Sequence, residues 1–444
     1  MIQRSSQELV NEFDDLKNVV GTFPRGFSRN TSFVYPLVRA DSLVTLNYGK
    51  GLVEKNRVPG IIPVYGTNGQ CGWHNEGLVK GPGVILGRKG MGPLGVEWCK
   101  SDFWVIDTAY YVTPNTPKLD LKFFYYLTKY IGLNHLKDGT SNPSLSRDTF
   151  SAQLLPFPPL DDQKAIAHIL GTLDDKIELN QQMNHTLESI ARALFKSWFI
   201  NFDPVRAKMD GRQPAGMDAE TAAVFPAEFE DSAIGKIPKG WEVKSIGDVV
   251  KAVGGATPST SEPAYWEGGT IHWSTPKDLA PLSSPVLLDT ERRITEQGLQ
   301  KISSGLLPKG TLLLSSRAPI GYLAIAEIPL AINQGYIAMV CDQELSNHYV
   351  LRWAQINMDI IEGRANGTTF MEISKKNFRP IPILIPSQQV LEVFANQAEL
   401  LHQQVVNNLY QNTSLISIRN TLLPKLLSSE IRVKDAERIV EAVA

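Results

Sequence analysis

Side chains that can bind base edges or phosphates are concentrated in polar, glycine-rich loops between the apolar runs of this sequence. Arg, Asn and Gln can make paired hydrogen bonds to bases, whereas Lys, Ser, Thr and backbone amides hold phosphate oxygens. The candidates in the first half of the chain are Lys50, Arg57, Tyr65, Thr67, Asn68, Gln70, Arg88, Lys89, Thr140, Ser141 and Asn142. Those in the second half are Thr260, Thr275, Lys277, Ser316, Arg317, Asn333, Gln334, Arg364, Asn366, Thr368 and Thr369. Turn chemistry alone explains any single one of them, but their recurrence in both halves predicts two nucleic-acid-binding surfaces.

Strings that resemble the catalytic motifs of DNA enzymes have simpler explanations. Asn142–Leu145 lacks the second proline and the aromatic residue that an adenine methyltransferase uses to hold its flipped base. Gly90–Gly92 is a lone glycine pair, which is a weak indication of nucleotide binding. Asp162–Lys164 has the acidic-x-Lys order of a nuclease site, but it opens a predicted helix, where carboxylates ordinarily complement the helix dipole. We therefore predict that the chain has no catalytic residues.

The sequence also predicts no metal site and no bound cofactor. It has no GxxxxGK[ST] phosphate-binding loop, which argues against a motor or NTPase. Its 7 histidines show no metal-ligand spacing, and its 3 cysteines are too scattered for a zinc site or a disulfide framework. A chain of this size without a catalytic constellation is more typical of a binder or scaffold.

Length and composition set further bounds. A chain of 444 residues is long enough for two or more domains. With 44 basic and 46 acidic residues it has no global positive field, so any nucleic-acid contact must depend on local patches or on other subunits. It shows no signal-peptide pattern and no apolar run of about 18 residues, which predicts a cytoplasmic protein without membrane contact.

The elements that must position the candidate loops are short strands with tight turns, because brief apolar runs alternate with glycines. In the first half we expect strands within Gly60–Tyr65, Gly83–Leu86, Phe103–Ile106 and Ala109–Thr113, followed by a helix at Leu121–Ile131. The second half repeats this order, with a helix at Asn347–Ile361 and with Arg317 as the expected counterpart of Arg88.

Each half ends in a long helical stretch, and the two stretches are copies of one another. The first runs from Asp161 to Phe199 and the second, 228 positions later, from Gln389 to Leu427. Their apolar residues alternate at spacings of three and four, which is the pattern of a coiled-coil seam. The seam positions that we single out are Leu173, Ile177, Asn180, Asn184 and Leu187 in the first copy, and Leu401, Val405, Asn408, Asn412 and Leu415 in the second.

The obvious partner for each stripe is the other copy, packed antiparallel about a pseudo-twofold axis. Buried asparagines at matching seam positions would fix the register of such a pair. The alternative is two amphipathic helices that pack separately, each on its own domain. Two departures stand near the end of the second helix: Pro424 is expected to break it, and Arg419 replaces Ala191 in the seam, where the packing would fray or face a partner subunit.

The chain resembles the specificity subunits of type I restriction–modification enzymes over nearly its whole length. No single motif is decisive, and the resemblance rests on the order of the motifs, which occurs twice in the chain. These are Ile237–Trp241 with Ile246–Val249, Val64–Gly69, the paired Gly87–Gly95 and Leu313–Gly321, the two long helices, and Leu422–Leu427.

This resemblance implies an α/β chain of the α+β type, with mixed or antiparallel sheets in two target-recognition domains. Two long antiparallel coiled-coil helices would separate these domains, and an internal pseudo-twofold repeat would relate the two halves of the chain. The expected segments are a first recognition domain at 1–159, a central helix at 160–200, a linker at 201–239, a second recognition domain at 240–386, a C-terminal helix at 387–428 and a tail at 429–444.

In function, the resemblance implies that each domain reads one half of a bipartite site in double-stranded DNA. Two methyltransferase subunits would dock on the chain, and restriction subunits would join that complex. Methyl transfer and cleavage, with S-adenosylmethionine, ATP and magnesium, would then belong to those partners. Two other readings stay open from the residues alone: a standalone DNA methyltransferase or nuclease, and a coiled-coil adaptor without a nucleic-acid role.

Overall fold

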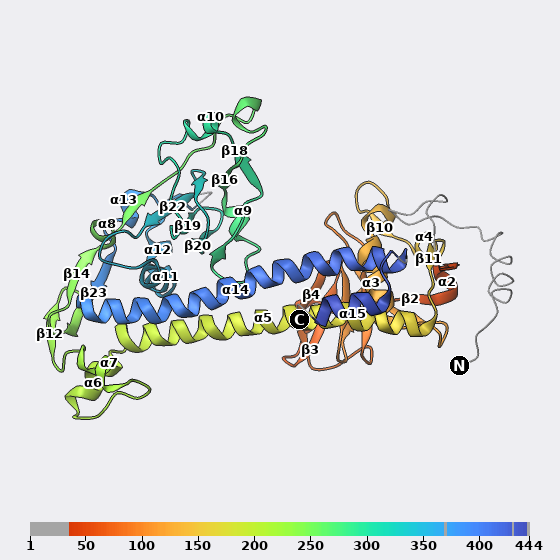
Figure 1. Cartoon of the computed structure of the whole chain (residues 1–444), viewed down its shortest axis with the longest axis horizontal. Coiled ribbons are helices and arrows are strands. Elements are labelled where there is room, and N and C mark those ends of the chain that lie inside the picture. The colour runs from red at the N-terminus through yellow and green to blue at the C-terminus, as the bar shows by residue number, and fades with distance from the viewer. Residues whose placement is uncertain (1–34, 368–370, 429, 442–444) are drawn as a thin grey trace. The chain divides into compact units, whose positions relative to one another are not determined.

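The computed structural model describes residues 35–367, 371–428 and 430–441. It divides into two compact units, here called unit 1 (1–178 and 411–444) and unit 2 (179–410). Both long helices pass from one unit into the other: α5 (Leu160–Phe199) and α14 (Gln388–Leu427), each of 40 residues (Figure 1). Unit 1 therefore contains the first half of α5 and the second half of α14, and unit 2 contains the reverse.

The two helices run antiparallel, as the sequence predicts. In unit 1, Asp174 of α5 pairs with Arg419 of α14. In unit 2, Asn184, ten residues later in α5, bonds to Asn408, which comes earlier in α14 than Arg419. Asn408 donates its amide to Asn184 Oδ1 at 2.8 Å, and both side chains are buried. Such a bond holds the register, because a slip along the seam would leave the buried amides unpaired.

Unit 1 contains two main sheets. Four antiparallel strands lie in the order β2-β8-β5-β6: β2 (Val44–Tyr48), β8 (Ala109–Pro114), β5 (Gly83–Gly87) and β6 (Val96–Cys99). Three more lie in the order β4-β3-β7: β4 (Gly69–His74), β3 (Ile62–Gly66) and β7 (Trp104–Val105). Because β3 and β7 run parallel, the fold is mixed, as expected. Smaller elements are β1 (Leu37–Arg39), α2 (Ala40–Leu43), η1 (Glu54–Asn56), η2 (Asn134–Leu136), β9 (Lys137–Asp138), β10 (Ser144–Leu145), α4 (Arg147–Ser151) and β11 (Leu154–Pro156).

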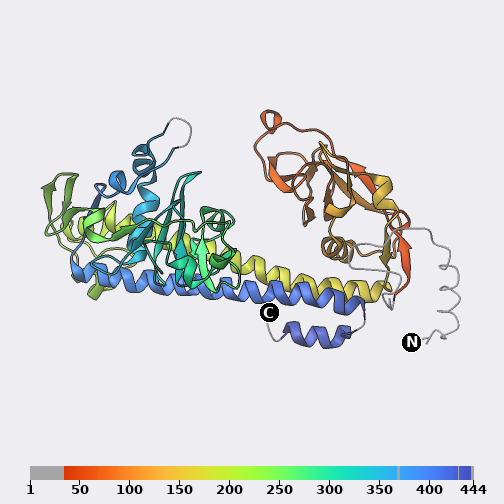
Figure 2. The same cartoon turned by 90° about the horizontal axis from the view of Figure 1, so that it is seen from above.

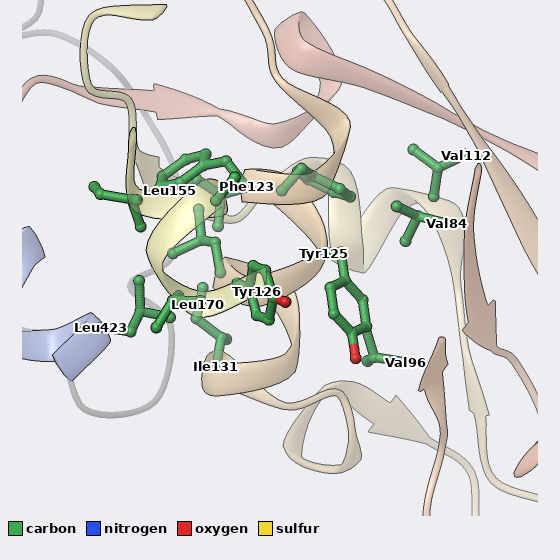
Figure 3. Close-up of a cluster of buried hydrophobic side chains, with 14 of the residues drawn as sticks. Val84, Val96, Val112, Phe123, Tyr125, Tyr126, Ile131, Leu155, Leu170 and Leu423 are labelled. Carbon is green, nitrogen blue, oxygen red and sulfur yellow. The ribbon is translucent and has the colours of Figure 1, made fainter. Parts of the chain in front are cut away.

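Helix α3 (Leu121–Ile131) joins the four-stranded sheet to the long helices, with the bounds that the sequence predicts. The Asp120 carboxylate caps its first turn by accepting from the Phe123 amide at 2.8 Å, and Gly132 ends it with φ 71°. Its aromatic side chains pack between strand residues such as Val84 and helix residues such as Leu170 and Leu423 (Figure 3). Burial of a side chain of this size contributes roughly 1.5–3 kcal/mol, so this core fixes the first sheet on its half of the helix pair.

Unit 2 repeats the same topology. Its strands β15 (Lys251–Val253), β22 (Tyr336–Val340), β19 (Leu312–Ser316) and β20 (Ile320–Ala326) have the order and pairing of β2-β8-β5-β6, and β17 (Val286–Leu287) adds a fifth strand. The strands β18 (Arg292–Ile294), β16 (Ile271–Ser274) and β21 (Leu330–Ile332) repeat β4-β3-β7, including its one parallel pair. The remaining elements of this repeat are β14 (Glu242–Ser245), α8 (Ile246–Val249), η3 (Pro263–Tyr265), α9 (Pro276–Leu279), α10 (Glu296–Leu299), α11 (Asn347–Ile356), α12 (Met358–Gly363), α13 (Lys375–Phe378) and β23 (Pro382–Ile385).

The helix expected at Asn347–Ile361 is in fact two helices, because α11 ends at Ile356 and α12 begins at Met358. Both the backbone amide and the side-chain amide of Asn357 donate to the Trp353 carbonyl, the latter at 2.8 Å. A side chain that competes for a carbonyl in this way ends a helix.

The segment 201–239, expected to be a linker, is an ordered part of unit 2. It forms α6 (Asp203–Met209), α7 (Ala219–Ala223) and a hairpin of β12 (Phe229–Ser232) and β13 (Gly235–Pro238). Val205, Phe225 and Ile237 are buried in the core of the unit, where the Phe225 ring meets that of Trp198 at 5.0 Å. The segment has no helical or strand periodicity because it contributes isolated apolar residues to a core that is built mostly by other elements.

The segment expected to be a tail also contains an ordered element. Helix α15 (Val433–Glu441) buries Ala436 and Val440 against the core of unit 1, and Figure 2 shows it beside the end of α14. The prediction that Pro424 breaks the second helix is wrong, because α14 continues to Leu427. Pro424 lies in the last turn, where the loss of one hydrogen bond disrupts little of the helix.

Arg419 does not fray the seam, because it is paired across the two helices. Its Nη1 donates to Asp174 Oδ1 at 2.5 Å, and the same carboxylate accepts from the Tyr126 hydroxyl through Oδ2 at 2.8 Å. An arginine in a seam is stable when a carboxylate on the facing helix neutralises it.

A buried carboxylate in unit 2 predicts a specific pH dependence. Glu327 accepts from His402 Nε2 at 2.8 Å and lies 2.8 Å from Lys309 Nζ. Although burial alone would raise the pKa of Glu327, the His402 and Lys309 contacts lower it to about 2. A carboxyl group with a lowered pKa stabilises the fold above its unfolded pKa of about 4.5, and this contribution is lost as the pH falls toward 2.

We therefore expect Glu327→Gln to lower the free energy of unfolding at pH 7 by an amount on the order of 3 kcal/mol. The difference in melting temperature between the variant and the wild type should shrink steadily from pH 5 to pH 3. A difference that stays constant across this range would show that the carboxylate charge is not the stabilising feature.

Candidate nucleic-acid interface

Three of the candidate loops of unit 1 meet at the end of β5. The Thr67 hydroxyl donates to the Lys89 carbonyl at 2.7 Å, and the Gly90 amide donates to the Pro143 carbonyl at 3.0 Å. The Leu145 amide donates to the Arg88 carbonyl at 2.7 Å. The backbone thus brings the segments near residues 67, 89 and 142 together, and it leaves Asn68, Thr140, Ser141 and Asn142 exposed at the surface.

The Arg88 side chain is turned toward the protein. Its Nε and Nη2 donate to the Asp107 carbonyl at 3.0 and 2.7 Å, and its guanidinium lies 5.1 Å from the ring centre of Tyr48. Lys89 pairs with the Asp107 carboxylate at 3.1 Å. Arg88 therefore braces the loop and fixes an aromatic ring that is 50% exposed.

Sequence reasoning missed two residues of this surface, Tyr48 at the end of β2 and Arg147 at the start of α4. The Arg147 guanidinium lies 4.7 Å from the Tyr48 ring centre, so Arg88 and Arg147 both contact the same exposed ring. Ser146 positions Arg147 by capping α4, where its side chain accepts from the Thr149 amide at 3.0 Å. Tyr48 and Arg147 are 99 positions apart, so no local pattern could have associated them.

The remaining candidates of unit 1 lie elsewhere. Lys50, with its Nζ 6.0 Å from the Trp104 ring centre, and Gln70 are exposed. Arg57 donates from Nη1 to the Cys71 carbonyl at 2.6 Å. Tyr65 is buried in an apolar cluster, where desolvation raises the pKa of its hydroxyl, so it does not offer its ring at the surface.

The structural counterpart of Arg317 is Lys89, not Arg88 as the sequence suggested. Lys89 forms a backbone bridge with Ser144, and Arg317 forms the equivalent bridge with Glu372, which is 228 positions after Ser144. Ser316, which takes the place of Arg88, is buried. The repeat in the sequence aligned Arg317 with Arg88. The hydrogen bonds between the strands instead align Arg317 with Lys89, one residue later.

By the same register, Lys375 is the counterpart of Arg147. Each is the first residue of a short helix, α13 or α4, and each follows a serine whose side chain caps that helix. The two units therefore carry a basic side chain at two shared positions, Lys89 with Arg317 and Arg147 with Lys375.

A cleft of about 490 Å³ in unit 2 brings together four of the candidates: Thr275, Lys277, Arg317 and Asn333. Thr275 and Asp278 form a capping box at the start of α9, and Asn333 Oδ1 accepts from the Gly335 amide at 2.9 Å, so the loops that form the cleft are fixed. The Arg317 Nη1 lies 3.6 Å from the Glu372 carboxylate. Lys277 is exposed at the cleft, and Arg292, which the sequence analysis did not single out, also lines it.

The other candidates of unit 2 do not line this cleft. Gln334 accepts from the Thr257 hydroxyl at 2.7 Å, and Arg364 lies 3.5 Å from the Asn377 carbonyl. Thr260 and Asn366 are exposed. Thr368 and Thr369 fall outside the described residues.

Within the ranges that the structure describes, no group of three or more His, Cys, Asp or Glu residues is placed to hold a metal ion. In the same ranges, no helix has the length and apolar character needed to cross a membrane.

Comparison with known proteins decides the family. The model of the type I restriction modification DNA specificity domain matches the chain twice, at residues 40–189 and 238–405. The chain belongs to this family. It is a specificity subunit of a type I restriction–modification system, and the two matches fall on the two repeats seen in the fold. The match gives no support to a standalone methyltransferase or nuclease, or to an adaptor without a DNA-related role.

Individual relatives agree with the family assignment. The chain is 27% identical to the Type I restriction enzyme HindI specificity subunit of Haemophilus influenzae, over 74% of this chain and 82% of that subunit. It is 38% identical to the Type I restriction enzyme MjaIX specificity subunit of Methanocaldococcus jannaschii, over 44% of this chain and 45% of the relative. The crystal structure of the type I S subunit from M. genitalium has the same fold, with a TM-score of 0.56 at 18% identity, covering 91% of this chain and 99% of that one.

Proposed function

We propose that each unit of this specificity subunit reads one half of a bipartite DNA site, and that the paired helices set the distance between the halves. The observation that carries this proposal is the repetition of a basic surface at equivalent positions, Lys89 with Arg317 and Arg147 with Lys375. Two domains that read different bases still face the same phosphate backbone, so shared basic positions suit the invariant part of DNA.

The residues around these positions differ between the units, as separate readers require. Unit 1 has exposed Tyr48 between two arginines, whereas Gly254 takes the place of Tyr48 in the register of unit 2. Unit 2 instead has the cleft lined by Thr275, Asn333 and Arg292. Side chains of these types bind base edges in the grooves, where sequence is read.

In this proposal the chain itself is not an enzyme and holds no cofactor. Two methyltransferase subunits dock on it and restriction subunits join the complex. Methyl transfer with S-adenosylmethionine, and ATP-driven cleavage with magnesium, take place in those partners. The chain thus contributes the choice of DNA sequence. Because its net charge is close to zero, much of the electrostatic attraction to DNA comes from the partner subunits.

The test is to map methylated bases across the genome of a host that expresses the methyltransferase partner with and without this chain. We expect one bipartite motif to be methylated only when the chain is present. Methylation of the same motif without the chain, or methylation by the purified chain alone, would overturn the proposal.

A further inference from the structure

One of the arginines that line the cleft of unit 2, Arg292, is stacked on aromatic rings. Arg292 opens β18, where it is the cross-strand partner of Trp273 on β16. Its guanidinium carbon lies 3.6 Å from the ring centre of Trp266 and 5.3 Å from that of Trp273. A distance of 3.6 Å means that the guanidinium lies on the face of the Trp266 ring, a favourable cation–π arrangement.

The aromatic platform under Arg292 is itself rigid. The Trp266 indole meets that of Trp273 edge to face at 5.0 Å. Trp266 Nε1 donates to the Ser259 carbonyl at 2.9 Å, and Trp273 Nε1 donates to the Ala256 carbonyl at 3.2 Å. Stacking on a fixed plane holds the guanidinium in one orientation before any ligand arrives, which lowers the entropy lost on binding.

The N–H groups of Arg292 are available to a ligand. In the part of the chain that the structure describes, no hydrogen bond or ion pair to its guanidinium is found, and the residue is exposed. The neighbouring Arg293 differs, because it pairs with Asp289 at 2.9 Å. Arg317, across the same cleft, lies 3.6 Å from the carboxylate of Glu372.

The equivalent position in unit 1 has no side chain. The strand register places Gly72 opposite Val64 where unit 2 has Arg292 opposite Trp273. A Cβ atom added at Gly72 would lie 2.3 Å from Arg57 Nη1, so the space is filled by a side chain from another loop that is bonded to the Cys71 carbonyl. Lys89 with Arg317, and Arg147 with Lys375, are basic at equivalent backbone positions in both units. The Arg57 guanidinium occupies the space of Arg292 in unit 1, but it is bonded to the Cys71 carbonyl, whereas the described residues give the Arg292 guanidinium no such bond. A guanidinium that is open to a ligand in one unit alone suits a base better than a phosphate.

We infer that Arg292 is a specificity-determining residue of unit 2 and that it reads a guanine by paired hydrogen bonds to O6 and N7. Guanine offers these two acceptors side by side in the major groove, and a planar guanidinium edge matches them. Glu291 lines the same cleft, with its amide held by Asp278 Oδ1 at 2.8 Å, and its carboxylate would repel phosphates but accept a hydrogen bond from cytosine N4. Arg292 and Glu291 are thus suited to base edges, while Arg317 of the same cleft is suited to the phosphate backbone. This inference rests on the proposed function, since it assigns one contact within it.

The experiment measures binding of the assembled complex to a library of duplexes in which the half-site of unit 2 is randomised. With Arg292→Ala, we expect the preference for guanine at one position to disappear and binding to the cognate duplex to weaken on the order of ten- to a hundredfold. Binding to unrelated duplexes, the other half-site and the melting temperature should not change. Arg292→Lys should lose the preference nearly as completely, because an ammonium cannot make the paired contact.

The matched control is Arg293→Ala, which removes the same charge from the adjacent residue of the same strand and should leave the guanine preference intact. Uniform weakening on all duplexes, with a shallower salt dependence, would show that Arg292 contacts a phosphate and would overturn the inference. An unchanged base preference in Arg292→Ala would also overturn it. A wild-type complex that shows no sequence preference at all would instead reject the proposed function, whatever the variant does.

Discussion

Insertion of one heptad into both α5 and α14, at the level of Asn184 and Asn408, is expected to move methylation to sites whose halves lie farther apart. The hydrogen bond between these two asparagines marks the same level on both helices, so the two insertions lengthen the pair together. Seven helical residues add about 10 Å, which corresponds to about three base-pair steps of about 3.4 Å. Methylation of the original sites should fall to background, since the two half-sites can no longer be bound at once.

The sequence of each half-site should stay the same, because neither reading surface is altered. The control is insertion of the same heptad into α5 alone. That change leaves Asn184 and Asn408 at different levels and should reduce stability instead of producing a new spacing. A doubly lengthened variant that still methylates sites of the original spacing would refute the role of the helices in setting the distance.

The second large effect concerns the buried ion pair between Glu188 of α5 and Arg352 of α11. The guanidinium donates from Nη1 and Nη2 to the two carboxylate oxygens at 2.6 and 3.2 Å. Neither side chain is more than 6% exposed. Glu188→Ala leaves the arginine charge buried without its partner, which typically costs about 3–5 kcal/mol. For a unit with a stability of roughly 5–15 kcal/mol, we expect a marked fall in the denaturant midpoint of unit 2.

Two comparisons separate an unpaired charge from a simple loss of contacts. Replacement of both residues by methionine removes both charges and should recover most of the lost stability. The control is Glu178→Ala, which removes another carboxylate of α5, one that is exposed and lies 2.8 Å from Lys100 Nζ. This change should cost less than about 1 kcal/mol. If the double variant is as unstable as Glu188→Ala, the charge is not the cause.

The sequence predicted the long elements well because their patterns are local. The seam spacing of α5 and α14 and the run of aromatic residues in α3 need only neighbours three or four positions apart, and each helix has the expected bounds to within one residue. The duplication predicted the repeated topology for the same reason. By contrast, α6 depends on a few apolar residues whose partners lie in distant elements, so no periodic signal marks it. Helix α15 was missed although its buried residues Ala436 and Val440 have helical spacing.

The candidate site was less predictable because it depends on which loops meet. Thr67 and Lys89 were singled out and do lie together, but Arg147 and Arg292 are placed by contacts with Tyr48 and Trp266 that span long stretches of sequence. Tyr65 and Ser316 have suitable chemistry but are buried, because the strands that carry them, β3 and β19, are covered on both faces. Cover on both faces comes from elements that are distant in the sequence, so the local pattern does not reveal it.

The most direct test of the central claim, that each unit reads its own half of the DNA site, is to replace Ile237–Pro386 with the matching segment of another member of the family. The methylated motif of the hybrid complex is then mapped at base resolution. We predict that one half of the motif changes to that of the donor, while the other half and the distance between them stay as in the wild type. A hybrid in which both halves change together, or in which neither changes, would contradict the account.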